Sequence, residues 1–225
     1  MLIKMYLQLS FLVRVLGSKI LRLIELVNLK ADWALKYPNN KTYPVRYFPI
    51  DLVTIGDYSY GPIDVYTYGA KGEGLEVGKF CSIAKDVKFV LGGNHKTNCL
   101  MTFPVKNKFG KEKENESLTK GKIVLEDDVW IGVGSTILSG VRLGEGCVVA
   151  AGSVVTKSFP SYAIIGGNPA RIIKMRFDEK VLNKLETSAI KISSIEAKDI
   201  IGNIEYYSDT LDEKTICDLI VHLKK

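Results

Sequence analysis

The chain has 225 residues, of which 46% are hydrophobic and 25% charged, and its net charge is +6. This composition is ordinary for a globular protein, and it excludes collagen-like chains and low-complexity disordered chains. The mild cationic excess suits a polyanionic small ligand as well as it suits nucleic acid or a membrane surface.

The first 30 residues are apolar but interrupted by charge at Lys4, Arg14, Lys19, Arg22 and Glu25. No uninterrupted apolar stretch reaches the roughly 18 residues that a membrane-spanning helix needs. On a helical wheel the polar residues share one side, which predicts an amphipathic helix, or two short helices broken near Gly17. Such a helix either packs on this protein or a sister subunit, or lies on a membrane surface with its basic face toward anionic lipid. Three prolines over residues 37–50 then predict an extended linker.

A six-residue repeat dominates the chain from residue 123. Its aliphatic positions are Leu125, Ile131, Ile137, Leu143, Val149 and Val155. The residue four positions after each of them is mostly small or apolar. A period of six fits neither a helix nor a plain strand, but it fits a solenoid of short strands joined by tight corners. The aliphatic residues then point into a prism, and stacked coils pair as parallel strands.

The same spacing occurs earlier and more weakly at Val77, Ile83 and Phe89. The Gly-rich stretch Gly61–Gly74 loses it, which predicts an insertion or a broken coil. Residues 92–121 carry mostly polar residues at the expected register, so we expect them to leave the prism as a long loop. A loop of this length is uncommon without a function.

The segment Pro160–Pro169 is expected to end the solenoid. Residues 178–187 and roughly 194–224 combine polar surfaces with apolar spacing, and they predict helices. A helical tail over the open end of a solenoid would cover its exposed edge.

Four segments resemble the xenobiotic acetyltransferase branch of the hexapeptide-repeat acyltransferases, which includes the type-B chloramphenicol and streptogramin acetyltransferases. They are Ile55–Gly61, Val77–Ala84, Gly92–Thr97 and Asp128–Gly132, while Ala150–Lys157 and Gly166–Arg171 are similar to the wider superfamily. The resemblance implies a mainly β fold, a left-handed parallel β-helix. The chain is then expected to contain an amphipathic helical segment with its linker (1–50), a β-helix acyltransferase domain with an excursion loop at about 92–121 (51–175), and a C-terminal helical tail (176–225).

The reaction that the resemblance implies is attack of a hydroxyl on the thioester of acetyl-CoA, with no metal required. A hydroxyl needs a base in hydrogen-bond reach, and histidine is the usual choice. His95 is the single histidine of the solenoid and its loop, and it ends the matching Gly-Gly-Asn-His sequence. We therefore expect His95 to act as the catalytic base, with its other ring nitrogen donating to a carboxylate or a carbonyl, and the resemblance implies that it acts at a boundary between subunits. Zinc chemistry of the γ-carbonic anhydrase type would need three imidazoles, and the single histidine of this region does not supply them.

Coenzyme A carries a 3′-phosphate and a pyrophosphate, which require cationic side chains and backbone N–H groups. By the superfamily match, Val133 and Ala151 line the pantetheine arm, Thr156 and Lys157 lie beside the adenosine end, and Arg171 and Lys174 supply charge for the phosphates.

Four further residues are candidates for the walls of the site. Trp130 should face outward because a narrow prism has no room for an indole, and it is either a subunit-interface aromatic or a wall of the pantetheine or acceptor pocket. Asn94, Tyr58 and Phe103 are candidates for contact with the acceptor.

The acceptor is suggested by a departure from the branch. Such proteins usually follow Asn-His-x-Thr with an acidic residue and Trp, whereas Asn98, Cys99 and Leu100 stand here. This favours O-acetylation of a sugar or surface-polysaccharide precursor, ahead of antibiotic O-acetylation, amino-sugar N-acetylation and, last, a non-catalytic scaffold. The family implies a homotrimer with sites at its interfaces and no nucleic acid partner. Four widely spaced cysteines without a CxxC motif suggest a cytoplasmic protein, with membrane association through residues 1–30 left open.

Overall fold

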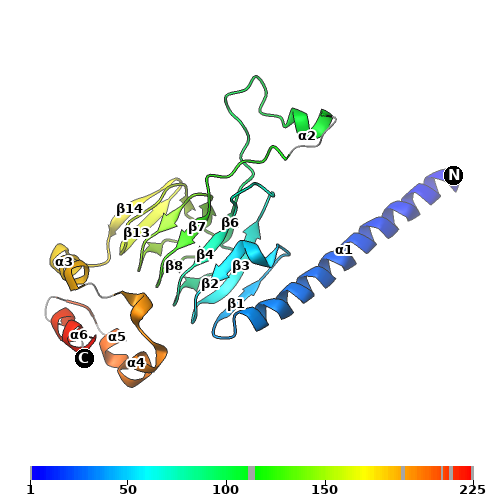
Figure 1. The fold of residues 1–225 in the computed structure, drawn as a ribbon. Coiled ribbons are helices and arrows are strands. Elements are labelled where there is room, and N and C mark those ends of the chain that lie inside the picture. The colour runs from blue at the N-terminus through cyan, green and yellow to red at the C-terminus, as the bar shows by residue number, and fades with distance from the viewer. Residues whose placement is uncertain (1, 111–114, 189–190, 209, 213–214, 224–225) are drawn as a thin grey trace.

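The computed structural model describes residues 2–110, 115–188, 191–208, 210–212 and 215–223. Within these ranges, the side chains of residues 2–10, 12–14, 193, 206 and 222–223 are not described. Figure 1 shows a central β body, with one long helix projecting from its N-terminal end and a group of short helices at the opposite end. A loop that carries one short helix stands out from the β body.

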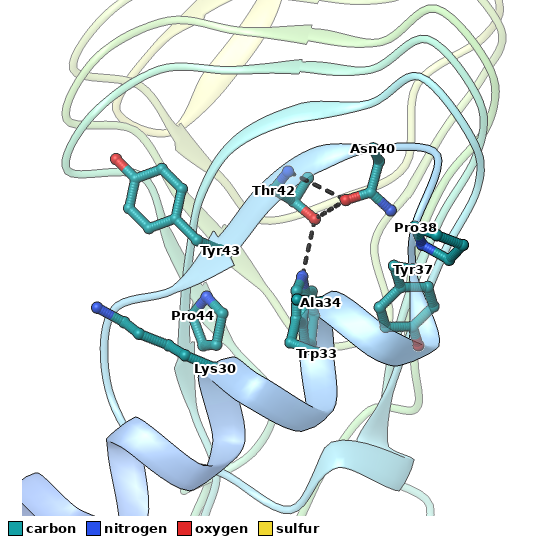
Figure 2. A pocket seen from close by; sticks show the side chains of 9 residues that line it. All are labelled: Lys30, Trp33, Ala34, Tyr37, Pro38, Asn40, Thr42, Tyr43 and Pro44. Carbon is teal, nitrogen blue, oxygen red and sulfur yellow. Dashed lines mark hydrogen bonds between the residues drawn. The ribbon is translucent and has the colours of Figure 1, made fainter.

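The N-terminal helix α1 (Leu2–Lys36) is a single element that continues through Gly17. A glycine inside a helix costs only about 1 kcal/mol relative to alanine, which a helix of this length tolerates. Near its C-terminal end Trp33 is buried, and the indole Nε1 donates to Oγ1 of Thr42 at 3.0 Å. The Thr42 hydroxyl donates in turn to Oδ1 of Asn40 (Figure 2).

The predicted linker over residues 37–50 contains a strand of the sheet. β1 (Lys41–Pro44) pairs in parallel with β3 (Tyr60–Tyr66), so the predicted extended conformation is correct but the segment is part of the sheet. Pro44 does not prevent this pairing because β1 pairs only with β3 and is an edge strand, where proline is tolerated. The turn η1 (Ile50–Leu52) then leads into the coil.

The β body is a coil whose strands form three parallel ladders. The first ladder stacks β2 (Val53–Ile55), β4 (Leu75–Val77), β7 (Ile123–Leu125) and β10 (Arg142–Leu143). The second stacks β3, β5 (Ser82–Ile83), β8 (Trp130–Ile131), β11 (Val148–Val149) and β13 (Ala163–Gly167). The third stacks β3 again, β6 (Lys88–Val90), β9 (Thr136–Leu138) and β12 (Val154–Val155). The chain passes from the first ladder to the second, to the third and back to the first.

The interior of the coil follows the six-residue repeat. The aliphatic positions from Leu125 to Val155 are all buried, none more than 2% exposed. The residues four positions after them are buried as well, with Phe159 the most exposed at 6%. The predicted inward face is therefore confirmed, and each turn buries its side chains against the turns above and below it.

One corner of the coil is missing where the six-residue spacing is lost. The seven-residue strand β3 runs directly from the second ladder into the third, because Tyr60 pairs with β5 while Asp64–Tyr66 pair with β6. Residues 67–74 then form a loop that leads to β4. The broken coil expected over Gly61–Gly74 is this merged strand together with its loop.

The solenoid continues further than predicted. Instead of ending at Pro160–Pro169, the chain adds β13 to the second ladder and turns back through β14 (Ala170–Met175), which runs antiparallel to it. The prediction was wrong because both prolines lie in turns, one before β13 and one between β13 and β14, where they interrupt no pairing.

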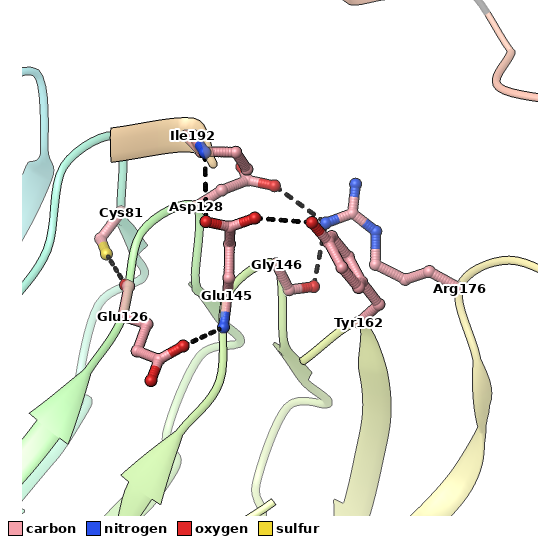
Figure 3. Close-up of polar contacts among 8 residues, drawn as sticks. All are labelled: Cys81, Glu126, Asp128, Glu145, Gly146, Tyr162, Arg176 and Ile192. Carbon is pink, nitrogen blue, oxygen red and sulfur yellow. Dashed lines mark hydrogen bonds and ion pairs between the residues drawn. The ribbon is translucent and has the colours of Figure 1, made fainter. Parts of the chain in front are cut away.

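The C-terminal tail consists of α3 (Glu179–Ser188), η2 (Ile192–Ser194), α4 (Ala197–Gly202), α5 (Ile204–Ser208) and α6 (Thr215–Leu223). The Glu145 carboxylate ties this tail to the coil, since it accepts the Tyr162 hydroxyl at 2.6 Å and the backbone N–H of Ile192 at 3.1 Å (Figure 3). Beside it, Arg176 forms an ion pair with Asp128 at 2.8 Å. Within the described chain, no helix has the length and apolarity to cross a bilayer.

Candidate active site

A complete turn of the coil has three corners, and we name a corner by the two ladders that it joins. The loop that carries His95 leaves the coil after β6 and returns at β7, at a third-to-first corner. It includes α2 (Val105–Phe109), and His95 is exposed on it. We call residues 91–122 the arm.

A main-chain carbonyl orients the imidazole of His95. Its Nδ1 lies 2.6 Å from the carbonyl oxygen of Thr102. A carbonyl oxygen only accepts hydrogen bonds, so Nδ1 is the donor, and in the neutral imidazole Nε2 is then the nitrogen with the lone pair. The sequence predicted a carbonyl or carboxylate partner without naming it, and Thr102 is that partner. An exposed Nε2 lone pair has the chemistry of a general base.

The base of the arm is closed by Asn94. Its backbone exchanges two hydrogen bonds with Leu118, at 3.0 and 2.8 Å. Its side-chain amide donates to Oγ of Ser139 at 3.4 Å, and the N–H of Lys120 donates to the same oxygen at 3.3 Å. Ser139 is only 5% exposed, at the end of β9. In this chain Asn94 therefore holds the two ends of the arm together.

A buried carboxylate beneath the arm is a residue that the sequence analysis missed. Glu73 is 6% exposed and accepts hydrogen bonds from the hydroxyl of Thr67 and from the N–H groups of Tyr68 and Gly69, the last two at 3.1 and 3.2 Å. A Cβ at Gly92 would collide with Oε1 of Glu73. The loop of residues 67–74 is therefore the floor on which the arm rests. The available signal was an acidic residue between two glycines, at the place where the repeat is lost.

Three of the predicted coenzyme contacts lie along one edge of the prism. Val133 and Ala151 occupy successive second-to-third corners, where the N–H of Gly152 donates to the Val133 carbonyl at 2.8 Å, and both side chains are exposed. Arg171 follows on β14 opposite Gly166, and a Cβ at Gly166 would lie 3.1 Å from Cβ of Ala150. A slim chain could approach the strand edge here because the surrounding residues are small.

The other predicted coenzyme contacts lie elsewhere. Thr156 and Lys157 follow β12 in a third-to-first corner, where the Lys157 Nζ lies 5.6 Å from the centroid of the Phe159 ring. Lys174 pairs with Ile164 in the hairpin of β13 and β14. The six residues therefore do not all lie along one edge of the prism.

The aromatic candidates divide between two edges as well. Trp130 faces outward with 56% of its surface exposed, as predicted, and Tyr58 lies at a first-to-second corner, stacked on Phe80 at 5.2 Å between ring centroids. The arm leaves the coil at a different edge. On the arm itself, Phe103 follows Thr102 and packs against Phe109 at 5.8 Å. Among the described residues, no three His, Cys, Asp or Glu side chains are placed to hold a metal ion.

Comparison with known proteins agrees with the six-residue repeat. A family model described as the hexapeptide repeat of succinyl-transferase matches residues 122–157. A "probable macrolide acetyltransferase" of Lysinibacillus sphaericus is 46% identical over 125 residues, which cover 51% of this chain and 69% of that protein. This chain belongs to the hexapeptide-repeat acyltransferases, in their xenobiotic acetyltransferase branch.

Two further proteins show how much of this acyltransferase resembles known ones. A chloramphenicol acetyltransferase of Agrobacterium fabrum is 38% identical over 111 residues, covering 47% of this acyltransferase and 53% of that protein. The chain therefore spans about half the length of that relative. A solved hexapeptide-repeat acetyltransferase from Vibrio cholerae shares 31% identity and a TM-score of 0.46, covering 56% of this chain and 64% of that one. The family identifies the chain as a transferase of acyl groups with acetyl-CoA as its co-substrate.

Proposed function

We propose that this acyltransferase moves the acetyl group of acetyl-CoA to a hydroxyl of a sugar or surface-polysaccharide precursor, with His95 as the base. The hydrogen bond from Nδ1 to the Thr102 carbonyl carries this proposal, because it leaves Nε2 free to take the hydroxyl proton. The hydroxyl oxygen forms a bond to the thioester carbon, the carbon–sulfur bond breaks, and coenzyme A leaves as a thiol that takes the proton from Nε2. Backbone N–H groups would hold the oxyanion of the intermediate.

The acceptor is proposed from the sequence of the arm. Asn98, Cys99 and Leu100 replace the acidic residue and Trp that are usual in the branch, so a pocket built for an antibiotic is altered there. Antibiotic O-acetylation is the second candidate, supported by the relatives named as macrolide and chloramphenicol acetyltransferases. Amino-sugar N-acetylation is the third.

We also propose that the active unit is a homotrimer with three sites at its interfaces. Trp130 and Val133 are 56% and 50% exposed along edges other than the one from which the arm leaves. A neighbouring subunit packed on those edges would bring its own His95 toward Val133 and Ala151. Tyr58 and Phe103 would then bound the acceptor.

The remaining features of the proposal follow the same resemblance. Thr156, Lys157, Arg171 and Lys174 contact the phosphates and adenosine of coenzyme A, and the coil is left-handed. The chain is divided into a helical segment with linker (1–50), the β-helix domain (51–175) and the helical tail (176–225), and the protein resides in the cytoplasm.

The test follows release of the coenzyme A thiol in the presence of methyl glycosides, chloramphenicol, a streptogramin and a macrolide. His95→Ala should lower kcat about 100-fold to 10,000-fold, as expected for loss of a general base. Lys96→Ala, on the next residue of the arm, should leave kcat unchanged. Turnover of a drug alone would overturn the sugar proposal, and an unchanged rate in His95→Ala would overturn the role of the base.

Shared sites are tested by mixing two inactive proteins. His95→Ala lacks the base, and Val133→Arg should block the pantetheine edge. Trimers assembled from both would contain one interface with an intact His95 and an intact Val133, so activity should return on mixing after dissociation. No recovery, or light scattering that shows a fully active monomer, would contradict the interface site.

A further inference from the structure

Helix α1 packs on its own β body with the side opposite to its most apolar face. Among the described side chains of α1, the buried ones are Leu29 and Trp33, and at 100° per residue they share one side of the helix. The side roughly 130° away presents apolar residues that are 50–62% exposed. They are Leu16, Ile20, Leu23 and Val27. We call these four residues the free face.

The anchor fixes which side of the helix is left free. Trp33 is 2% exposed and its indole is held by Thr42, while Lys36 lies 3.8 Å from the carboxylate of Asp51 (Figure 2 shows the Trp33 side). Rolling the helix to bury the free face on the β body would expose Trp33 and break its hydrogen bond. The free face therefore needs a partner outside this chain's own coil.

The charge around the free face points to the chemistry of that partner. The first 24 residues of the chain contain four cationic residues, Lys4, Arg14, Lys19 and Arg22, and no acidic residue. Both Lys19 and Arg22 are exposed. A helix with an apolar face and a cationic polar face matches the chemistry of an anionic lipid surface.

A second copy of the helix is less well matched. Lys19 and Lys30 flank one side of the free face, whereas the residues along its other side, Gly17, Ile24 and Ala31, are uncharged. A paired copy would therefore offer no acidic residue to these lysines, although helix pairs usually select partners through opposite charges at flanking positions.

We propose that α1 docks this enzyme on the surface of an anionic phospholipid bilayer. The helix lies flat in the interface, with the free face toward the acyl chains and the cationic side chains toward the headgroups. This docking is independent of acetyl transfer, and it would hold the β body at a membrane surface.

The experiment is flotation of the full-length protein with vesicles of phosphatidylcholine alone and of an equal mixture of phosphatidylcholine and phosphatidylglycerol. The test variant is Leu23→Asp, in the free face. The matched control is Leu21→Asp, because Leu21 and Leu23 are 57% and 62% exposed but lie about 160° apart on the helix. Both variants introduce the same charge within one turn of the same exposed helix.

We expect wild type to bind the anionic vesicles and not the neutral ones, and high salt to weaken the binding. Leu23→Asp should lower the vesicle partition coefficient about tenfold or more, since it removes a leucine that the docked helix would bury in the bilayer. Leu21→Asp should stay near wild type. Circular dichroism melting of both variants checks that the fold is retained. Equal losses in the two variants, or equal binding to both vesicles, would overturn the proposal. A wild type that ignores vesicles and a Leu23→Asp variant of lower oligomeric state would show that a second copy covers the free face.

Discussion

The carboxylate of Glu73 lies directly beneath Gly92, three residues before His95 in the sequence. The two belong to different loops, and the contact is possible because residue 92 has no side chain. The carboxylate is in turn fixed by donors from Thr67, Tyr68 and Gly69. The position of the arm is therefore set by a buried acid that does not belong to the arm.

Gly92→Ala is expected to shift the arm, since the added Cβ has no space beside Glu73. Overpacking of this kind costs about 1–3 kcal/mol of folding free energy. We expect a lower melting temperature and a lower kcat, with the KM for acetyl-CoA changed less because the proposed coenzyme contacts Val133 and Ala151 lie at another edge of the prism. Gly202→Ala is the control, because a Cβ there meets nothing within 4 Å. A normal kcat in Gly92→Ala would show that the floor does not position His95.

Ser139→Ala tests the other attachment of the arm. It removes the acceptor of the Asn94 amide and of the Lys120 N–H, and a hydrogen bond of this kind is worth about 0.5–1.5 kcal/mol. We expect faster proteolysis within the arm and a lower kcat. Ser158→Ala is the matched control. The Ser158 hydroxyl accepts the N–H of Arg142 at 2.9 Å, in the same kind of corner one turn further along the coil and away from the arm. Equal proteolysis and equal kcat in the two variants would contradict the role of Ser139 in holding the arm.

The inward face of the coil could be predicted because the relevant information is local. A residue every six positions points inward whatever the distant chain does, so Leu125 to Val155 are all buried as expected. The hydrogen bond between His95 and Thr102 could not be predicted, because it depends on the path of the arm. The contact between Glu73 and Gly92 depends in the same way on two loops that meet only in three dimensions.

Helix α1 shows a similar limit. Its amphipathic pattern is visible in the sequence, but the pattern does not tell which side packs on the β body. The two side chains that do so, Leu29 and Trp33, lie outside the apolar stripe. The indole of Trp33 is held by Thr42, which follows the helix in β1. The order of elements could thus be read from the sequence, while the orientation of the helix required the structure.

Tyr162→Phe is expected to loosen the C-terminal tail from the coil. Burial and the hydrogen bond to Glu145 raise the pKa of Tyr162, so its hydroxyl stays protonated and donates across the whole physiological range. Without that donor, Glu145 keeps the N–H of Ile192 and loses its fixed orientation, at a cost of about 1–2 kcal/mol. Limited proteolysis should cleave the tail faster than in wild type. Tyr47→Phe, at a tyrosine that is 51% exposed, should change nothing. Equal cleavage rates in the two variants would contradict the tether.

The two buried cysteines predict how stability changes at alkaline pH. Burial raises the pKa of both the Cys81 and the Cys147 thiols to about 12, from an ordinary value near 9.0. The folded state holds these protons more tightly than the unfolded state, so the stabilisation is complete below pH 9 and is lost as pH rises toward 12. Urea unfolding at a series of pH values should show this decline. Cys147→Ala should make the decline shallower even if it lowers stability at neutral pH, whereas Cys99→Ala, at an exposed thiol, should leave the slope unchanged. In native protein, a thiol reagent at pH 8 should label Cys99 before either buried cysteine, and rapid labelling of Cys147 would contradict the argument.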